Sequence, residues 1–352
     1  MYIAIRVGIV GASGYTGGEL LRLLAGHPEV EVTYVTSREY SGKSIHHVHY
    51  NLRGYYKGLK FSEFSFDEVS RRSDAVFLAL PHGISVNYVP KLLEVGLKVI
   101  DLSADFRLRK PELYEVWYGF KHPYPDLLSK AVYGLPEIHR SELRNSNLVA
   151  SPGCNATAVI ISLLPLAKSN AVDLSKVVAD IKAGSSEGGS KPNQGSHHPE
   201  REGAIRPYDA EGHRHAAEVE QELSQITGGE VNVTLIPHAV SNVRGVLSST
   251  HLWLVRDVDD LDLMKLYVQT FSKEPFVRFV RTLPPGYPDP KYVVGSNYVD
   301  VSYAVERRVK RLTTFSALDN LVKGAAGQAV QSFNIVMGLK EDLGLKYAPL
   351  KP

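Results

Sequence analysis

The first 24 residues contain the pattern that most restricts how this chain can fold. Residues 3–10 form a nearly continuous apolar run rich in β-branched side chains, which predicts a buried strand. Gly11, Gly14 and Gly17 follow at once, and residues 19–24 repeat leucine at helical spacing. A strand, a glycine-rich turn and a helix in this order are typical of the first unit of a dinucleotide-binding α/β fold.

The turn itself is spaced GxxGxxG, whereas the commoner fingerprint is GxGxxG. Its glycines would let the backbone approach a diphosphate, which would lie at the N-terminus of the following helix. Gly11 and Gly14 are therefore candidate cofactor-binding residues. The alternative is a plain tight turn between a strand and a helix.

Residues 30–36 predict a second strand, and its end bears on the choice of cofactor. Units that prefer NAD place an Asp or Glu there to bind the ribose 2′-hydroxyl, whereas a nearby Arg accommodates a 2′-phosphate. The residues here are Thr36, Ser37 and Arg38. A hydroxyl and a guanidinium suit a phosphate, so the sequence predicts NADP. The alternative is that Arg38 is an ordinary solvated charge.

Further strands and helices alternate up to residue 101. The apolar run 73–80, a helix over 84–94 and a strand over 98–101 predict a doubly wound parallel sheet of the Rossmann type. Loops at the carboxyl ends of such strands line the ligand crevice, which makes His82 a candidate cofactor contact. A hydrogen bond between His82 and the backbone is an equally good interpretation.

Arg107 lies just beyond the strand at 98–101 and is a candidate clamp for a substrate phosphate or carboxylate. A structural pair between Asp105 and Arg107 would explain the same residues. Residues 111–136 are rich in Tyr, Pro and His without a clear period, so we expect a long ordered loop with short helical pieces.

The only cysteine of the chain lies in the stretch Ser151-Pro152-Gly153-Cys154-Asn155. Residues 147–150 predict a short strand before it, and the apolar run 158–168 predicts a buried helix after it. Cys154 would then lie at a helix N-terminus, whose free N–H groups and positive dipole favour a thiolate. The same N–H groups and the side chain of Asn155 could hold an oxyanion. A buried structural cysteine is the alternative.

Residues 185–210 are polar and rich in Gly, Ser and His. A loop of this length in a compact domain is usually functional or disordered. Gly188 would let the backbone lie against a nicotinamide ring. Arg201 and Arg206 lie in the same loop.

Two histidines follow this loop, His213 and His215. Histidine titrates near neutral pH, so either one could activate the thiol of Cys154 and later donate a proton. The histidine pairs between 197 and 215 are spaced i,i+1 and i,i+2, which differs from the i,i+4 spacing of a zinc-protease helix. We therefore expect no metal site.

The second half of the chain changes from alternating elements to a run of strands. Residues 231–237 and 244–255 predict an antiparallel pair, and residues 298–306 and 310–316 predict a hairpin. Such a run of strands indicates an α+β domain. The final helix, over 320–338, contains several Gly and Ala residues, and we expect it to return to the nucleotide-binding domain.

Composition argues against several classes of protein. A net charge of +2 gives no case for binding nucleic acid or a membrane surface. A single cysteine excludes an internal disulfide and a cysteine-rich zinc or iron–sulfur site. The N-terminus lacks the features of a signal peptide, and no apolar run reaches the length of a membrane-spanning helix. We expect a soluble, cytoplasmic protein of two domains.

Five motifs together resemble the N-acetyl-gamma-glutamyl-phosphate reductase family, nearly end to end and in the same order. The fold of that family is similar to that of aspartate-semialdehyde dehydrogenase, which pairs a Rossmann-type sheet with an α+β domain. The resemblance implies an NADP-binding domain over 1–152 with 318–352, and a catalytic and dimerisation domain over 153–317. The motifs are residues 11–17 (GASGYTG), 102–108 (LSADFRL), 151–155 (SPGCN), 212–215 (GHRH) and 319–326 (DNLVKGAA).

The resemblance implies that the protein reduces an acyl phosphate to an aldehyde with NADPH. Cys154 matches the nucleophile, which would form a thioester as phosphate leaves. His213 or His215 matches the acid/base region, and the sequence does not distinguish the two. The residues implied to contact NADP are Ser13, Gly14, Tyr15, Thr16, Ser37, Arg38, Glu39 and Asn320.

Residues 196–201 and 205–208 depart from the usual acetylglutamate enzymes. They resemble the relatives, of LysY type, whose substrate is tethered to LysW, an acidic amino-group carrier protein of lysine or arginine biosynthesis. On this resemblance we expect a carrier-linked 2-aminoadipyl phosphate, and also a glutamyl phosphate, as substrate. Arg201 and Arg206 would pair with acidic groups of the carrier. The alternative is a mobile loop with ordinary solvated charges.

The sequence therefore leaves three functions to weigh. The first is reduction of a carrier-linked acyl phosphate by a homo-oligomer, either a dimer or a tetramer. The second is reduction of free N-acetyl-glutamyl phosphate. The third is a non-catalytic dinucleotide-sensing protein, which would keep the glycine turn but would not need Cys154 beside histidines.

Overall fold

The computed structural model describes residues 4–281, 284 and 286–351, and the chain divides into two compact units. The first unit contains Met1–Pro152 with Ala325–Lys346, and the second contains Gly153–Gly324 with Tyr347–Pro352. The return to the first unit thus occurs at residue 325, later than the expected boundary at 318. The final residues belong to the second unit, not to the first.

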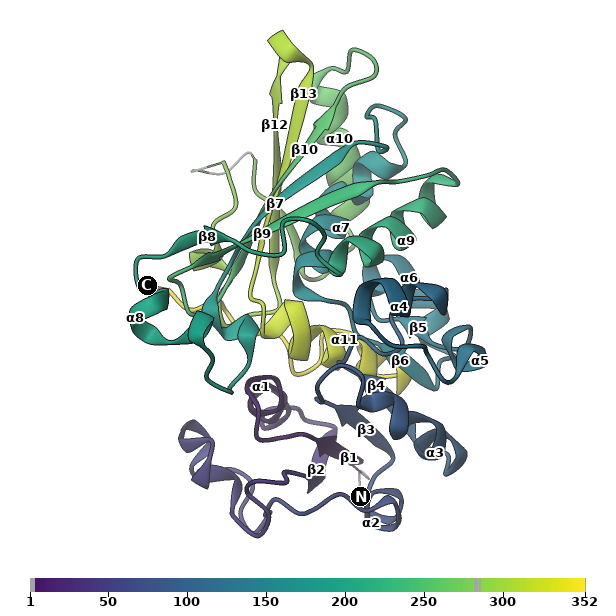
Figure 1. Cartoon of the computed structure of the whole chain (residues 1–352), viewed down its shortest axis with the longest axis vertical. Helices are drawn as coiled ribbons and strands as arrows, with labels where there is room; N and C mark the ends of the chain where they lie inside the picture. Colours follow the sequence, from purple (N-terminus) through teal and green to yellow (C-terminus); the bar gives the residue numbers. More distant parts are fainter. Residues whose placement is uncertain (1–3, 282–283, 285, 352) are drawn as a thin grey trace. The chain divides into compact units, whose positions relative to one another are not determined.

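The first unit is built on a sheet of six strands in the order β2-β1-β3-β4-β6-β5 (Figure 1). Every neighbouring pair is parallel, which confirms the predicted doubly wound parallel sheet. The central strands are nearly all apolar, as strands covered on both faces are. The strands are β1 (Ile5–Val10), β2 (Val30–Val35), β3 (Ala75–Leu78), β4 (Lys98–Asp101), β5 (Val132–Tyr133) and β6 (Leu148–Ala150).

Helices cover this sheet in two groups: α2 contacts α3, while α11 contacts both α1 and α6. The helix expected over 84–94 begins only at Val89, where Pro90 fits the first turn, and Ser85–Asn87 form a separate 3-10 turn. The helices are α1 (Tyr15–Leu24), α2 (Phe66–Arg72), α3 (Val89–Glu94), α4 (Glu112–Tyr118), α5 (Pro125–Leu128), α6 (Pro136–Leu143) and α11 (Gly327–Val336).

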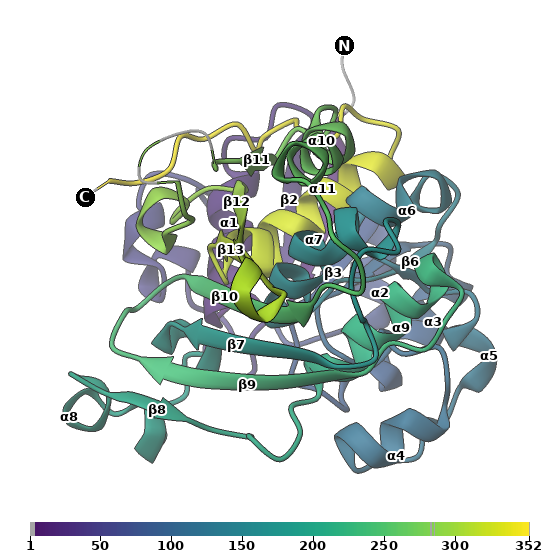
Figure 2. The ribbon, with the colours of Figure 1, turned by 90° about the horizontal axis from the view of Figure 1, so that it is seen from above.

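The second unit is built on a mixed sheet of seven strands in the order β11-β12-β13-β10-β7-β9-β8. Figure 2 shows β7, β9 and β8 side by side. The predicted hairpin is confirmed, since β12 and β13 pair antiparallel. The strands are β7 (Val177–Ala183), β8 (Ile205–Pro207), β9 (Val233–Val240), β10 (Val246–Trp253), β11 (Val277–Phe279), β12 (Val299–Glu306) and β13 (Arg311–Leu318).

The strands predicted to be antiparallel, now seen as β9 and β10, do run in opposite directions, but they are not neighbours. β7 lies between them, parallel to β9 and antiparallel to β10. Burial alternates along both strands. Alternation determines the face that a side chain occupies but not the strand that lies alongside, so consecutive strands need not be neighbours.

The helices α7, α9 and α10 pack against one another and against one face of the mixed sheet. α7 is buried along its whole length apart from Cys154, its first residue. On the other face, alternate side chains of β7, β9 and β10 are only half-buried, among them Asp180, Lys182 and His238. The helices of this unit are α7 (Cys154–Ala167), α8 (His198–Arg201), α9 (His215–Thr227) and α10 (Asp260–Phe271).

The region 320–338 is not one continuous helix. Val322–Ala326 form a π-helical turn before α11 begins, and the N–H of Gly324 donates to the carbonyl of Asp319 at 2.9 Å. The carboxylate of Asp319 accepts from the N–H groups of Leu321 and Val322, which caps the start of this turn. π-Helical turns are rare and occur frequently at functional sites.

Short 3-10 turns complete the fold at Ile45–His47, Tyr50–Leu52, Ser185–Gly188, Gln194–Ser196, Pro290–Tyr292 and Arg307–Val309. Within the described residues, no helix is both long enough and apolar enough to cross a bilayer.

Candidate active site

The glycine turn of the first unit is sterically restricted to glycine at two positions. Gly11 has a φ of 85°, and a Cβ there would lie 2.3 Å from the carbonyl oxygen of Ala79. A Cβ on Gly17 would lie 2.6 Å from the Cα of Ala12. The turn is also tied to the end of β2, because the N–H of Ala12 donates to the carbonyl of Thr36 at 3.0 Å. The local backbone therefore explains the glycine spacing.

The N-terminus of α1 offers N–H groups to a ligand. Its N-cap, Gly14, supplies no side-chain cap, and the space around it is open. The hydroxyl of Ser37, at the end of β2, donates to that of Ser13 at 2.9 Å, which brings two hydroxyl groups together beside the turn. Arg38 and Glu39 follow and are exposed. Uncapped helical N–H groups, hydroxyls and an exposed guanidinium fit the diphosphate of a dinucleotide.

The loop after β3 is held by backbone hydrogen bonds. His82 is exposed, and its Nδ1 accepts from the N–H of Ala104 at 3.0 Å. The carboxylate of Asp105 accepts from the N–H groups of Gly83 and Val86 at 2.6 and 3.0 Å. Burial raises the pKa of Asp105. Asp105 thus fixes the loop that carries His82, and the hydrogen bond expected between His82 and the backbone is present.

Arg107 supports the strand that leads to the cysteine. Its guanidinium donates from Nε to the carbonyl of Ser151 at 2.7 Å and from an Nη to the carbonyl of Leu102 at 3.1 Å. Its side chain is only 5% exposed. These contacts differ from the substrate clamp expected from the sequence, because the guanidinium is occupied in joining the ends of β4 and β6.

Cys154 is the first residue of α7, which therefore begins earlier than the expected 158. Gly153 is the N-cap and contributes no side-chain cap. The Sγ of Cys154 lies 3.6 Å from Oδ1 of Asn155, whose side chain is buried. A half-buried thiol at an uncapped helix N-terminus is the environment in which a thiolate is favoured.

α9 supplies two side chains to this cysteine turn. Oε2 of Glu218 accepts from the N–H of Gly153 at 3.0 Å, and its Oε1 lies 3.9 Å from Nε2 of His215. A Cβ on Gly153 would lie 2.4 Å from that same Nε2, so the imidazole packs directly against the residue preceding Cys154. Glu218 is fully buried and His215 is nearly so. The sequence predicted His215 but gave no role to Glu218.

His213 occupies a different position from His215. Its Nδ1 accepts from the N–H of His215 at 3.2 Å, and the two rings are edge-to-face with centroids 4.6 Å apart. Burial, with a smaller contribution from Arg214, lowers the pKa of His213 to about 3. His213 is therefore neutral near pH 7 and caps the start of α9.

Asn320 holds the turn that contains Gly188. Its Oδ1 accepts from the N–H of Gly245 at 2.8 Å, and its Nδ2 donates to the hydroxyl of Ser186 at 2.8 Å. Gly188 itself is exposed, and a Cβ added to it would have no atom within 4 Å. Asn320 thus positions the backbone on which a nicotinamide contact was expected.

Three further residues of this site were missed by the sequence reasoning. A Cβ on Gly324, in the π-helical turn, would lie 2.6 Å from the Cβ of Cys154, so only glycine fits there. Tyr208 donates to Oε1 of Glu187 at 2.7 Å, and its ring lies 6.2 Å from that of His213. The small-residue run around Gly324 was the available signal, whereas nothing local points to Tyr208 or Glu187.

The two arginines of the 185–210 segment are bound within the unit. Arg201 donates to the carbonyls of Val240 and Ala183, both at 2.8 Å, and thereby joins the ends of β9 and β7. Arg206 donates to the carbonyls of Glu200 and Gly195, both at 3.1 Å. Both guanidinium groups, expected to meet a carrier, thus also form hydrogen bonds within their own unit. They fasten a segment that also forms the edge strand β8.

No metal-binding group was found in the part of the chain that the structure describes: no three His, Cys, Asp or Glu side chains are placed to hold an ion.

Comparisons with known proteins first define the class. The family model "Semialdehyde dehydrogenase, NAD binding domain" matches residues 6–146, and "Semialdehyde dehydrogenase, dimerisation domain" matches residues 154–320. The structure of aspartate semialdehyde dehydrogenase II from Vibrio cholerae, complexed with ASA, has a TM-score of 0.70 at 18% identity and covers 95% of this chain and 98% of its own. That of the Candida albicans enzyme with NADP has a TM-score of 0.68 at 16% identity and covers 95% and 99%. The predicted fold class is confirmed.

Relatives of higher identity narrow the class. Proteins named LysW-L-2-aminoadipate/LysW-L-glutamate phosphate reductase are 61% identical in Sulfolobus acidocaldarius, 60% in Sulfurisphaera tokodaii and 58% in Saccharolobus solfataricus. Each alignment covers 99% of this chain and 99% of the relative. The chain therefore belongs to this family of phosphate reductases within the semialdehyde dehydrogenases, and it is an oxidoreductase with a domain for a nicotinamide dinucleotide. The family expected from the sequence is confirmed.

Proposed function

We propose that the protein reduces an acyl phosphate, carried by a LysW-type protein as 2-aminoadipyl or glutamyl phosphate, to the semialdehyde with NADPH. The observation that carries this proposal is the cysteine turn, where Cys154 begins α7 and His215 and Glu218 pack against Gly153. The names of the relatives supply the carrier and the two acyl groups. The place of the reaction is then lysine and arginine biosynthesis.

Cys154 is the proposed nucleophile. Its thiolate attacks the acyl carbon, a C–S bond forms, and the C–O bond to phosphate breaks, so that a thioester and inorganic phosphate result. The N–H groups at the start of α7 stabilise the negative charge that develops on the acyl oxygen, and Asn155 orients the sulfur through their contact at 3.6 Å. A reduced nicotinamide dinucleotide, when bound, supplies the hydride that takes the thioester to the aldehyde level.

His215 is the proposed acid/base. It accepts the thiol proton of Cys154 and later donates a proton as the C–S bond of the hemithioacetal breaks and the aldehyde leaves. Glu218 is a positioning residue, because its carboxylate joins the N–H of Gly153 to the region of the imidazole and stabilises a protonated ring. His213 is proposed to act through His215 by fixing the start of α9, since its low pKa keeps it neutral.

The cofactor is proposed to be NADP, bound at the carboxyl ends of the strands of the first unit. The diphosphate would lie on the uncapped N–H groups of α1, and Ser37 and Arg38 would bind the 2′-phosphate. Asn320 would act by holding the turn of Gly188. The residues proposed to contact the cofactor are Gly11, Ser13, Gly14, Tyr15, Thr16, Ser37, Arg38, Glu39, His82 and Gly188.

The protein is also proposed to work as a homo-oligomer. The second unit matches a dimerisation domain, and one face of its sheet is only half-covered along β7, β9 and β10. A second copy of the chain on this face would bury those side chains.

A direct assay tests the proposed function. Purified protein should oxidise NADPH with LysW-linked 2-aminoadipyl or glutamyl phosphate and release one phosphate per NADPH. Free N-acetyl-glutamyl phosphate should be turned over at least about tenfold more slowly in kcat/KM, since it lacks the binding energy of the carrier. Equal or better use of the free acetylated substrate would overturn the carrier part of the proposal and leave the chemistry of Cys154 intact.

A further inference from the structure

The first unit carries an unusual concentration of positive charge between β2 and α2. Residues 43–60 contain Lys43, Arg53, Lys57 and Lys60 and no Asp or Glu, although the whole chain carries a net charge of only +2. All four side chains are exposed. We call this segment the basic surface.

The basic surface is held firmly, although it has no long helix or strand. Ile45, Leu52 and Phe61 are buried beneath it and anchor its backbone. The hydroxyl of Tyr56 donates to the carbonyl of Leu21 at 2.5 Å, and Nε2 of His49 lies 2.8 Å from the carbonyl of Ala12. The backbone of the basic surface is therefore held in place, which fixes the positions from which the charged side chains extend.

The fold brings like charges together on this surface. Ser44 and Lys60 form an antiparallel bridge, and the N–H of Phe61 donates to the carbonyl of Lys43 at 2.9 Å. Lys43 and Lys60 are thus held on adjacent chain segments. In the described part of the chain, no carboxylate forms an ion pair with any of the four basic side chains. Like charges kept together without compensation cost stability, so an external anion would relieve their repulsion.

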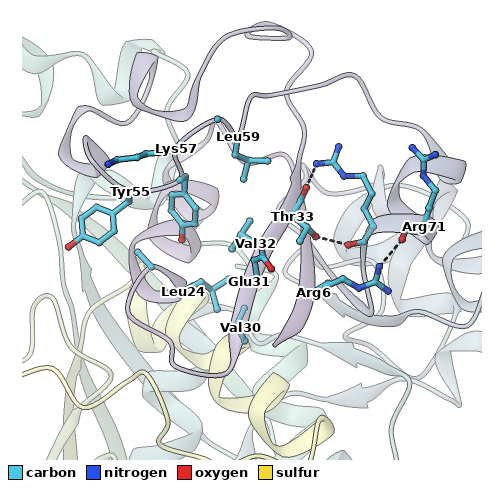
Figure 3. A pocket seen from close by; sticks show the side chains of 14 residues that line it. Arg6, Leu24, Val30, Glu31, Val32, Thr33, Tyr55, Lys57, Leu59 and Arg71 are labelled. Carbon is cyan, nitrogen blue, oxygen red and sulfur yellow. Dashed lines mark hydrogen bonds between the residues drawn. The ribbon is translucent and has the colours of Figure 1, made fainter. Parts of the chain in front are cut away.

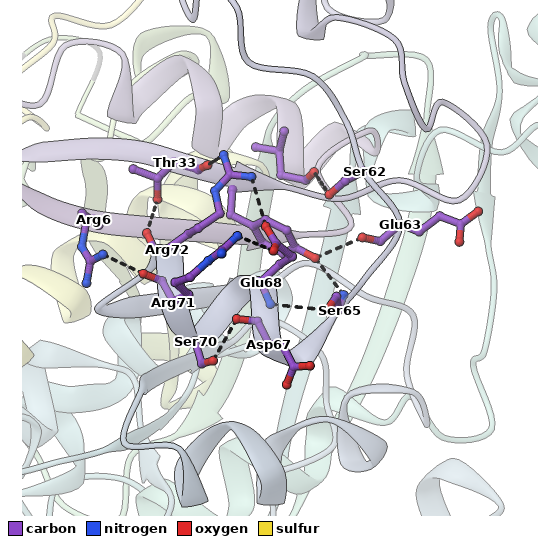
Figure 4. Close-up of polar contacts among 12 residues, drawn as sticks. Arg6, Thr33, Ser62, Glu63, Ser65, Asp67, Glu68, Ser70, Arg71 and Arg72 are labelled. Atoms are coloured by element: carbon purple, nitrogen blue, oxygen red, sulfur yellow. Dashed lines mark hydrogen bonds and ion pairs between the residues drawn. The ribbon is translucent and has the colours of Figure 1, made fainter.

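The neighbouring arginines behave differently. Arg6 pairs with Asp74 at 2.7 Å, while Arg71 and Arg72 pair with Glu68 at 2.5 and 3.8 Å. Figure 4 shows these guanidinium groups turned toward the carboxylate and carbonyl oxygens around α2. Two carboxylates thus offset most of the charge of these three arginines. Among the residues that the structure describes, the four basic side chains of the basic surface have no such carboxylate partner.

A cavity of about 640 Å³ opens beside the basic surface. Tyr55, Lys57 and Leu59 line one side, and Figure 3 shows them facing the apolar side chains of Leu24 and Val32 across it. Tyr55 is 55% exposed and Tyr50, nearby in the chain, is 71% exposed. Tyrosine is enriched at protein-binding surfaces, and a patch of one sign of charge steers a partner of the opposite sign.

We propose that the basic surface and this cavity bind an acidic protein, with an apolar or aromatic side chain of that protein in the cavity. On the proposed function, this protein is the carrier that brings the acyl phosphate. Nucleic acid fits less well, because the residues outside this segment carry a net negative charge and a duplex extends far beyond so small a surface. Arg201 and Arg206, by contrast, form hydrogen bonds to backbone carbonyls of the second unit.

The test combines charge reversal with a matched control. The variant Arg53→Glu/Lys57→Glu/Lys60→Glu changes the surface, whereas Lys110→Glu/Lys121→Glu/Lys130→Glu changes the net charge equally at exposed positions elsewhere in the same unit. Arg38 is left unchanged, so that the KM for NADPH reports an intact cofactor site. Binding of purified LysW-type carrier is measured by titration at low and high salt, together with turnover of carrier-linked and free acyl phosphates.

The surface variant should bind the carrier at least about tenfold more weakly at low salt, mainly through slower association, while the control loses less than about twofold. Turnover of a free acyl phosphate and the KM for NADPH should stay unchanged in both. Added salt should weaken binding of the carrier to the wild type and reduce the difference in affinity between the wild type and the surface variant. A Tyr55→Ala variant should also weaken binding, but without changing its salt dependence.

Two failures can be told apart. If wild-type protein binds and uses the carrier but the surface variant matches the control, the inference is wrong and the proposed function stands. If wild-type protein does not bind the carrier, the proposed function fails and the inference fails with it. Binding of a duplex oligonucleotide that the surface variant alone loses, without carrier binding, would also overturn the inference.

Discussion

The glycine turn after β1 and the cysteine turn after β6 are built alike but differ in what completes them. Both run from a parallel strand into a helix whose N-cap is a glycine without a side-chain cap. The first turn is completed by residues close in sequence, with the end of β2 supplying Thr36 and Ser37. The second is completed from far away, by His215 and Glu218 of α9 and by Gly324.

On the proposed function, the glycine turn binds the cofactor and the cysteine turn carries out the reaction. In the first turn the N–H groups of Gly11 and Ala12 are bound to Thr36, whereas the N-terminus of α1 has no side-chain cap, which suits an anion that arrives and leaves. In the second turn the N–H of Gly153 is already bound to Glu218, and an imidazole packs on the same glycine. A buried carboxylate and an imidazole that pack against the residue preceding Cys154 agree with the proton transfer proposed for this turn.

The largest expected effect is that of Cys154→Ala, which should abolish turnover and leave NADPH binding close to wild type. The reason is that, on the proposed function, the second turn supplies the nucleophile and the first supplies the cofactor site. Turnover by single-cycle kinetics and NADPH binding by fluorescence titration would measure both. Appreciable turnover in the variant would show that Cys154 is not the nucleophile and that the two turns do not divide binding and reaction between them.

Replacing each of the two histidines in turn would separate their roles at the second turn. His215→Asn should lower the rate of thioester formation on the order of 10²-fold, the usual scale for a lost general acid/base. His213→Asn should lower it much less, because His213 is neutral and acts through its hydrogen bond to the N–H of His215. Burst kinetics of phosphate release would measure both rates. The reverse order of effects would assign the acid/base to His213.

His213 should also shape the stability of the protein toward acid. Its pKa is about 3 in the folded protein, below the ordinary value of 6.5, so the unfolded chain binds the extra proton first. The stabilisation is therefore fully present above pH 6.5 and is lost as the pH falls from there toward 3. Between pH 6.5 and 5 the loss is on the order of 2 kcal/mol in the free energy of unfolding. Denaturant unfolding of wild type and His213→Asn at both values should show that the variant loses less.

Glu218→Gln tests whether the carboxylate matters beyond its shape. The amide keeps the size of the side chain but cannot stabilise a protonated His215 by charge, so kcat should fall by about tenfold and its pH profile should shift to lower pH. Glu220→Gln is a matched control on the same helix, where the carboxylate accepts from the N–H of Val233 instead. Equal losses in the two variants would reduce Glu218 to a structural role.

The smallest effect is expected in the first turn. Arg38→Ala should raise the KM for NADPH by about three- to fivefold, because Arg38 is exposed and an exposed ion pair contributes at most about 1 kcal/mol. The KM for NADH and kcat should change little. Equal effects on both cofactors would show that Arg38 does not bind the 2′-phosphate.

The sequence predicted the first turn well and the second only in part, for a physical reason. Gly11 and Gly17 are required because a side chain at either position would clash with backbone close to the turn. Their spacing is therefore a local signal. Glu218 and Gly324 contact the cysteine turn only after α9 and the π-helical turn have packed, and no local pattern records this. The order of β9, β7 and β10 was missed for the same reason, because the neighbours of a strand are decided by the whole sheet.

The presence of a single cysteine has a practical consequence. In denatured protein an electrophile such as iodoacetamide titrates one equivalent per chain and so counts polypeptides. In native protein the same reagent counts only those chains whose thiol is accessible and ionised, and the ratio gives the fraction of competent subunits. Cys154→Ser also provides a background without thiols. In that background Lys57→Cys would carry a fluorophore onto the basic surface and report carrier docking directly.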